Sequence, residues 1–242
     1  MTRVLRRLAL LLLVLVAGTA GAAHAGRPQL QLAWHAPYGT PGARDTLTMV
    51  AGDSTKTDTL YISFDPGEHD STFVGINATI MMRSADHDSL NAWWRYTAPM
   101  QVRIGPFNPR VEYNDTGYWG MLSPWTTGGI GQSAWDCSRQ NGRLRFVYAV
   151  GPTQGAPLDS GKTYVVARAI FHHPPKGIAN SGQPLCLEFQ LASLAYNNLL
   201  PEEETHWGEH RMVSINSPGG QICKDFIQQT QGRAPAPWKP KE

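Results

Sequence analysis

The chain has 242 residues, and its 21 Lys plus Arg nearly balance its 19 Asp plus Glu. This balance excludes the strongly basic composition typical of nucleic-acid-binding domains, and no polybasic run favours an anionic membrane surface. Hydrophobic residues make up 41% of the chain, which is enough to build a packed core without relying on disulfides.

The N-terminal segment Met1–Ala25 is typical of a secretory signal peptide. Three arginines precede the apolar run Leu8–Ala17, and small residues lead to an A-x-A cleavage site at Ala23–Ala25. The apolar run is shorter than the roughly 20 residues that a membrane span needs. We therefore expect a mature chain that begins at Gly26, has no membrane span, and is secreted, periplasmic or attached to the cell surface.

Short β-prone segments fill the mature chain and are separated by Gly, Pro, Asp and Asn. They are rich in Val, Ile, Tyr, Phe and Thr, as strands are. In chain order, the expected strands are Gln29–His35, Thr57–Phe64, Phe73–Arg83, Met100–Gly105, Gly142–Val150, Lys162–His173, Gln183–Leu194 and Arg211–Asn216.

The clearest alternation is in Phe73–Arg83, where a period of two predicts a half-buried strand. The apolar residues Val74, Ile76, Ala78, Ile80 and Met82 share one face of it. The other face carries Gly75, Asn77, Thr79, Met81 and Arg83.

Helix signals are few, namely one possible turn at Ser89–Tyr96 and another at Phe226–Gln231. Many short strands and almost no helical periodicity predict an all-β fold, a two-sheet β-sandwich, as a single domain over residues 26–225. The Pro-rich residues 226–242 are expected to form a flexible C-terminal tail. The long middle segment Pro106–Asn141 has no regular pattern and is expected to be a functional or poorly ordered loop.

Three cysteines remain after signal removal, so one is left over if two of them pair. An exported protein meets an oxidising compartment, which favours a disulfide. We favour Cys186–Cys223, because each lies at the edge of a strand-like segment late in the chain, although sequence alone leaves the connectivity open. The spacing of the three does not suit a zinc site.

Several of these stretches together resemble a known group of proteins. They are "DTLYISFDPG", "FVGINATIMMRS", "LNAWWRY", "YVVARAIFHH" and "PLCLEFQLASL". Their order over Gln29–Gln221 resembles uncharacterised exported bacterial proteins with an adhesin- or cohesin-like β-sandwich. The resemblance implies two sheets with about nine strands, as in cohesin and carbohydrate-binding modules, and it implies no particular ligand.

Two short motifs resemble catalytic ones. Ser54 in "MVAGDST" resembles the nucleophile of GDS-type ester hydrolases, but the Asp-x-x-His block that supplies the base in that family is missing. "HWGEH", His206–His210, matches an inverted zinc-protease motif, but Gly208 weakens the helix that it needs. A tight turn and a solvated loop are the favoured interpretations, so we expect no catalytic residue.

Carboxylates gather in two turns, Asp65–Asp70 and Ala85–Ser89. Calcium binds such oxygen-rich loops, but polar turns with Asp bonded to its own backbone are the favoured interpretation. We therefore expect no cofactor, with calcium as the alternative. His172 and His173 point to opposite faces of their strand and are expected to be a surface pair.

Four aromatic residues are candidates for a ligand-stacking surface: Trp94, Tyr118, Trp119 and Trp125. For the adjacent pair Trp93–Trp94, a place in the core is the favoured interpretation, with Trp94 the more exposed member if either is exposed. The other three lie in the irregular middle segment, where loops often carry function.

These features predict a secreted, non-catalytic recognition module with a protein or polysaccharide ligand outside the cytoplasm. Protein interaction or adhesion at the cell surface is the first hypothesis. The alternatives are a carbohydrate-binding module that uses the exposed aromatics and an ester hydrolase with Ser54 as nucleophile. Asn77 and Asn114 also lie in N-x-[ST] sequons.

Overall fold

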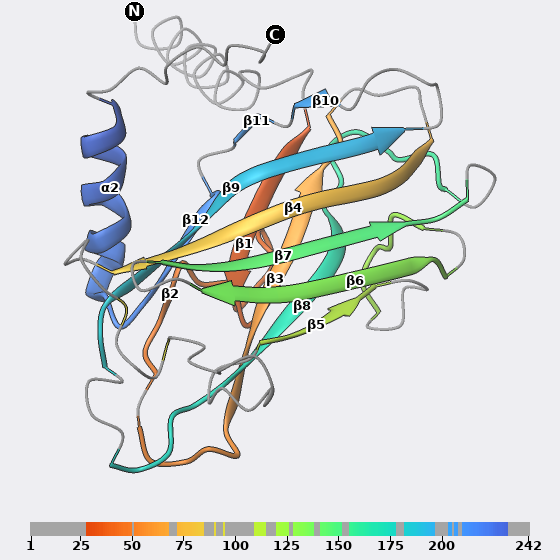
Figure 1. Ribbon diagram of the computed structural model, residues 1–242. Helices are drawn as coiled ribbons and strands as arrows, with labels where there is room; N and C mark the ends of the chain where they lie inside the picture. The colour runs from red at the N-terminus through yellow and green to blue at the C-terminus, as the bar shows by residue number, and fades with distance from the viewer. Residues whose placement is uncertain are drawn as a thin grey trace, which may run out of the picture.

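The computed structural model describes residues 28–49, 51–67, 72–84, 90, 94, 109–114, 120–125, 128–137, 141–151, 155–177, 182–196, 203–204, 206–207 and 210–231. The expected signal peptide, the expected strand Met100–Gly105 and residues 232–242 lie outside these ranges. Within them the chain forms two β-sheets and a C-terminal helix (Figure 1).

The first sheet has five strands in the order β11-β1-β3-β8-β5. Its neighbours pair antiparallel, except that β1 and β11 run parallel. The strands are β1 (Gln29–Trp34), β3 (Thr57–Asp65), β5 (Arg110–Tyr113), β8 (Tyr164–His172) and β11 (His206–Trp207).

The second sheet has seven strands, six of them in the order β2-β12-β9-β4-β7-β6, while β10 pairs with β9 beside this path. The two longest strands, β4 and β9, lie at its centre. The strands are β2 (Thr46–Leu47), β4 (Phe73–Ser84), β6 (Ile130–Cys137), β7 (Asn141–Ala149), β9 (Leu185–Tyr196), β10 (Glu203–Glu204) and β12 (Met212–Ile215).

The apolar faces of the two sheets meet in one core. Leu32 and Trp34 of β1 and Ile62 of β3 come from the first sheet, while Ile76 and Ile80 of β4 come from the second. All five side chains are buried, as the alternation of apolar residues in the sequence predicts. The two-sheet β-sandwich is confirmed, and nine of its strands have four or more residues, while β2, β10 and β11 have two each.

The middle segment differs from the expectation. Pro106–Asn141 contains two strands, β5 and β6, which pair with β8 and β7. Their sequences, "RVEY" and "IGQSAWDC", hold too few apolar residues in alternation to be recognised alone. Hydrogen bonding to a longer neighbouring strand stabilises each segment as a strand, although its own β-propensity is weak.

The C-terminal end of the chain packs on the second sheet. A 3-10 turn, η1 (Pro218–Gly220), leads into the helix α2 (Gln221–Gln231), and Ser217 accepts a hydrogen bond from the main-chain N–H of Ile222 at 3.1 Å. Phe226 is buried against the sheet. The expectation of a flexible tail from residue 226 is therefore wrong for its first six residues, because an apolar helical face continues across the expected boundary.

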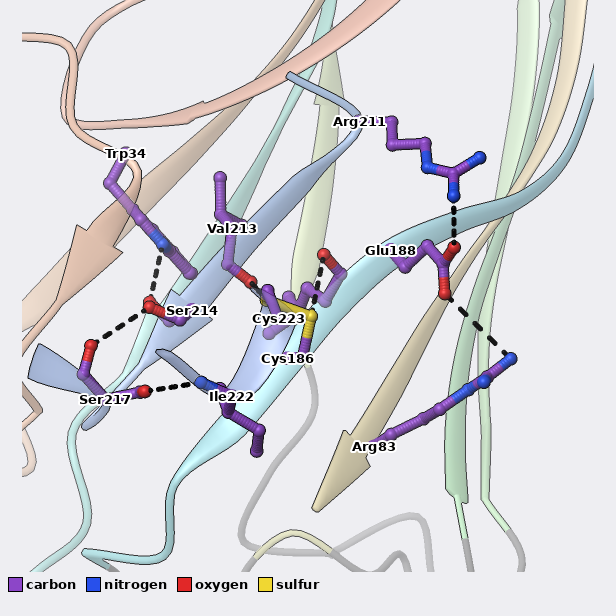
Figure 2. The surroundings of a disulfide bond; sticks show 11 residues. Trp34, Arg83, Cys186, Glu188, Arg211, Val213, Ser214, Ser217, Ile222 and Cys223 are labelled. Atoms are coloured by element: carbon purple, nitrogen blue, oxygen red, sulfur yellow. Dashed lines mark hydrogen bonds and ion pairs between the residues drawn. A yellow bond between two sulfur atoms is a disulfide. The ribbon is translucent and has the colours of Figure 1, made fainter. Parts of the chain in front are cut away.

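A disulfide joins this helix to the sheet (Figure 2). Cys186 in β9 and Cys223 in α2 are the bonded pair, which is the pairing favoured from the sequence. Both cysteines are buried, beside Met212, Ile222 and Phe226. The bridge fixes α2 over the β12 and β9 side of the second sheet.

Candidate functional site

Two of the four aromatic candidates lie in the core. Trp94 is 0% exposed and Trp125 is 4% exposed. An indole ring stacks on a sugar only when its face reaches solvent, so neither residue serves as a stacking surface. The expectation of an exposed platform is wrong for both. Tyr118 and Trp119 lie outside the described residues.

Trp125 packs into the main core of the sandwich. Its ring stacks on Phe73 at 4.8 Å and lies 4.8 Å from the ring of Tyr148. A bridge with Gly155 fixes its main chain, and Ser123 accepts a hydrogen bond from its N–H at 3.1 Å. The Trp125 side chain therefore lies in the core, because burying a large aromatic ring is more favourable than leaving it in water.

Ser54 lies in an exposed turn, as the interpretation of "GDST" as a turn predicts. Asp53 accepts hydrogen bonds from the hydroxyl and the main-chain N–H of Thr55, and these bonds lower the pKa of Asp53 below its usual value. Among the described histidines, none hydrogen-bonds Ser54. The geometry that activates a serine nucleophile is therefore not present in this part of the structure.

One polar cluster was not foreseen from the sequence. His173 is only 1% exposed and hydrogen-bonds the buried carboxylate of Asp58, which also lies 3.7 Å from Nδ1 of His35. The expectation of a surface pair is therefore wrong for His173, although His172 is exposed. His173 follows β8 and its main-chain N–H bonds Lys56, which turns the ring inward.

The expected metal loops are only partly described. Asp65 accepts a hydrogen bond from the main-chain N–H of Gly67 at 2.9 Å, the local turn favoured from the sequence. His206 and Trp207 form the strand β11, so this half of "HWGEH" is not helical. Within the described ranges, no three His, Cys, Asp or Glu side chains are grouped to hold a metal ion. The described helices also include none with the length and apolarity of a membrane span.

The outer face of the second sheet has two unlike halves. Near α2 it is covered, because Ile222, Cys223 and Phe226 pack on Cys186 and Met212. At the edge of this covered half, Glu188 of β9 lies between two arginines, with Arg211 at 3.5 Å and Arg83 at 4.0 Å (Figure 2).

Away from α2, none of the described helices or strands lies over the same face, and we call this part the open face. Register and alternation place on it small or neutral residues from four neighbouring strands together with Arg145, and Arg143 and Asp136 follow next along the same face. Its members are Gly75, Asn77, Thr79, Ile130, Gln132, Ala134, Arg145, Val147, Ala149, Ser193 and Ala195.

Two large apolar side chains stand out from the open face. Ile130 is 79% exposed and Val147 is 41% exposed, and they lie on the neighbouring strands β6 and β7. In the row of residues that runs from Ile130 across β7 and β4 to β9, the side chains are small. A Cβ atom added at Gly75 would lie 3.5 Å from the Cβ of Ala195 and 3.6 Å from that of Ala149, so these three residues form a closely spaced floor. The open face thus combines exposed apolar side chains with a floor of small residues, and its charged residues lie toward Arg145 and Arg143.

Part of this site was visible in the sequence. The second face of Phe73–Arg83 was recognised as Gly75, Asn77, Thr79, Met81 and Arg83, and all but the last two lie on the open face. The contribution of β6 was missed because that strand was not expected.

The similarity of this chain to known proteins lies in its fold alone. No family model matches the sequence, and the comparison with curated proteins gives no match. Solved cohesin structures are similar to the chain, and three of them are described here.

A type I cohesin–dockerin complex from Clostridium thermocellum includes a chain with 12% identity and a TM-score of 0.43, and the match covers 80% of this chain and 97% of that one. A type II cohesin domain from the Acetivibrio cellulolyticus cellulosome has 11% identity, a TM-score of 0.39 and the same coverage. A cohesin module of a Clostridium perfringens family 33 glycoside hydrolase has 6% identity and a TM-score of 0.39, over 80% of this chain and 98% of that one. Such values assign neither a partner nor an activity to this chain.

Proposed function

We propose that the protein is a non-catalytic recognition module, secreted or held at the cell surface, which binds a protein partner through the open face. The observation that carries the proposal is the exposure of Ile130 and Val147 on a sheet face whose other residues at that end are small or neutral. The expected signal peptide and the Cys186–Cys223 disulfide support a place outside the cytoplasm, because disulfides persist in oxidising compartments.

The composition of the open face suits a protein partner better than a polysaccharide. The centres of protein interfaces are depleted of charge and bury apolar side chains on flat, closely packed surfaces. Sugar binding by stacking needs an exposed aromatic ring, and the open face contains none. The small residues Gly75, Ala149 and Ala195, in the same row as Ile130, let a partner approach the sheet closely.

Site-specific photo-crosslinking tests this proposal. The photoreactive residue p-benzoylphenylalanine is placed at Val147 in one variant and at Thr57, an exposed strand residue of the first sheet, in a matched control. Both are produced in the native cells and irradiated. We expect a discrete protein adduct from position 147 and none from position 57.

A second variant checks that the adduct reports the open face. The photoreactive residue is moved to Ile130, and Val147→Arg is added. We expect the adduct from position 130 to be lost, because a long charged side chain then stands in the centre of the interface. An adduct that persists in this variant, or equal adducts from positions 147 and 57, would contradict the proposal. Retention on insoluble polysaccharides that Val147→Arg abolishes would instead assign a sugar ligand to the face.

A further inference from the structure

The outer face of the second sheet changes in chemistry along its strands. The exposed apolar side chains Ile130 and Val147 lie toward one end of the open face. Arg145 and Arg143 lie two and four residues before Val147 on β7, so alternation places all three on the same side of the sheet. The open face therefore leads from an apolar end to Arg143 and Arg145, which we call the arginine pair.

The charge at the arginine pair is positive. The strands β4, β6, β7 and β9 contain no lysine, and their acidic residues are Asp136 and Glu188. Glu188 lies 4.0 Å from Arg83, which is outside the arginine pair. Asp136 is the register partner of Arg143 and balances one of the two charges of the pair. This end of the face therefore attracts a group of negative charge.

Arg143 has unused capacity for hydrogen bonding. Its side chain is half-buried, and its Nε is buried without a hydrogen-bond partner. A buried donor without an acceptor is unfavourable, and a carboxylate placed against the planar guanidinium offsets this cost. Arg145 is exposed and lies about 7 Å farther along the strand, so a second acceptor can approach it from the same side.

We propose that the partner of the open face presents an acidic segment to the arginine pair and an apolar side chain to Ile130 and Val147. This inference rests on the proposed function and specifies the chemistry of the protein partner. Val147 and Arg143 are four residues apart on one strand, which corresponds to about 13 Å. The carboxylate and the apolar side chain of the partner are then separated by a similar distance, which fixes the direction in which the partner lies along the strands.

The residues around the arginine pair suit such a partner. Arginine is enriched at protein interfaces and at their hot spots, whereas lysine is depleted. The residues that share the rows of Val147 and Arg145 on β4 and β6 are neutral, so they add no repulsion against an acidic segment. They are Asn77, Thr79, Gln132 and Ala134.

Photo-crosslinking in the native cells tests the proposal. The photoreactive residue p-benzoylphenylalanine is placed at Ile130, which leaves Val147 and the arginine pair unchanged. We expect the protein adduct from this position to fall about tenfold or more when Arg143→Gln and Arg145→Gln are added, because charge-assisted hydrogen bonds are lost. Mass spectrometry of the adduct from the parent chain is expected to identify a crosslinked segment that contains Asp or Glu.

Two sets of variants serve as controls. Arg44→Gln changes the net charge at an exposed arginine between β1 and β2, and it is expected to leave the adduct unchanged. Arg143→Lys with Arg145→Lys keeps the charge but not the planar fork, so it is expected to retain part of the adduct. Thermal unfolding followed by circular dichroism shows that each variant is folded.

The possible outcomes separate this inference from the proposed function. An undiminished adduct in the folded glutamine variant, or a crosslinked segment without Asp or Glu, overturns the acidic partner and leaves the proposed function standing. The absence of any protein adduct from positions 130 and 147 of the parent chain contradicts both. Retention on the anionic polysaccharide heparin that the glutamine variant loses, without a protein adduct, would instead assign the arginine pair to a polysaccharide and overturn the proposal.

Discussion

Asp58 and His173 form a buried polar pair where β3 begins and β8 ends. Replacing Asp58 by alanine removes the carboxylate that hydrogen-bonds the buried His173 ring. We expect Asp58→Ala to lower the free energy of unfolding by about 3 kcal/mol, because an unsatisfied buried group bears its full desolvation cost. Urea unfolding followed by tryptophan fluorescence measures this change.

His35 supplies the control for this prediction. It lies on the partly exposed side of Asp58 and has a φ of 69°, a conformation that asparagine tolerates. We expect His35→Asn to lower the free energy of unfolding by less than about 1 kcal/mol, as for an exposed ion pair. Equal losses in both variants would mean that burial of His173 is not the cause.

Tyr113 gives a prediction about alkaline pH. Burial and the neighbouring Tyr148 raise the pKa of Tyr113 to about 12, above the usual value of 10. Between these values the unfolded chain loses the phenol proton and the folded chain keeps it, so the free energy of unfolding falls as pH rises from about 10 to about 12. Phenolate absorbance at 295 nm is expected to include a step near pH 12 that Tyr113→Phe removes.

The direction in which an aromatic side chain points was the weakest part of the sequence interpretation. Trp94 and Trp125 lie in segments without strand periodicity, so no alternation indicates which side faces the core. Trp125 is placed by contacts with Phe73 and Tyr148, which are distant in sequence. Contacts of this kind are set by the arrangement of the sheets and are invisible in the local pattern.

The disulfide is the main covalent constraint on the C-terminal elements. Cys186 and Cys223 are separated by 37 residues, and closing a loop of that length is worth about 4 kcal/mol in the chain-entropy model. We expect the double variant Cys186→Ser/Cys223→Ser to lose this amount in urea unfolding, because its unfolded chain is less restricted.

Reductant and the third cysteine provide the controls. Dithiothreitol is expected to lower the free energy of unfolding of the native chain to that of the double variant and to leave the double variant unchanged. Cys137→Ser, outside the bridge, is expected to behave like the native chain in both conditions. A Cys137→Ser variant that no longer responds to reductant would assign the bridge to a different pair.

At the scale of elements, the sequence predicted strands where apolar residues alternate. Seven expected strands match β1, β3, β4, β7, β8, β9 and β12 to within a few residues. β5 and β6 lie at the sheet edges, where one side of a strand needs no apolar partner, so their sequences carry little periodicity. The helix α2 was recognised only from Phe226 onward, because Pro218, Gly219 and Gly220 just before it suggest a loop.

The whole molecule is expected to unfold as one unit. Its main core takes side chains from both sheets, such as Phe64 and Phe171 from the first and Phe146 and Phe189 from the second. Neither sheet can keep its apolar face buried when the other separates. Far-ultraviolet circular dichroism and tryptophan fluorescence are expected to report the same urea midpoint. Two separate midpoints would show that the sheets unfold independently.

The candidate site is formed by several strands from different parts of the chain, which explains why the sequence indicated only part of it. The alternation in β4 identifies which residues share a face, but not whether that face is covered. Coverage depends on α2 lying over β9 and on β7 and β6 extending the sheet on the other side. Those neighbours follow from the order of strands, which no local pattern specifies.

The strand order also has a consequence for how the chain is made. β1 pairs with β11, and β2 pairs with β12, so the first two described strands find these neighbours only among the last described strands. β12 also supplies Val213 and Ile215 to the core. On the ribosome, neither sheet can therefore be complete until β11 and β12 have been synthesised.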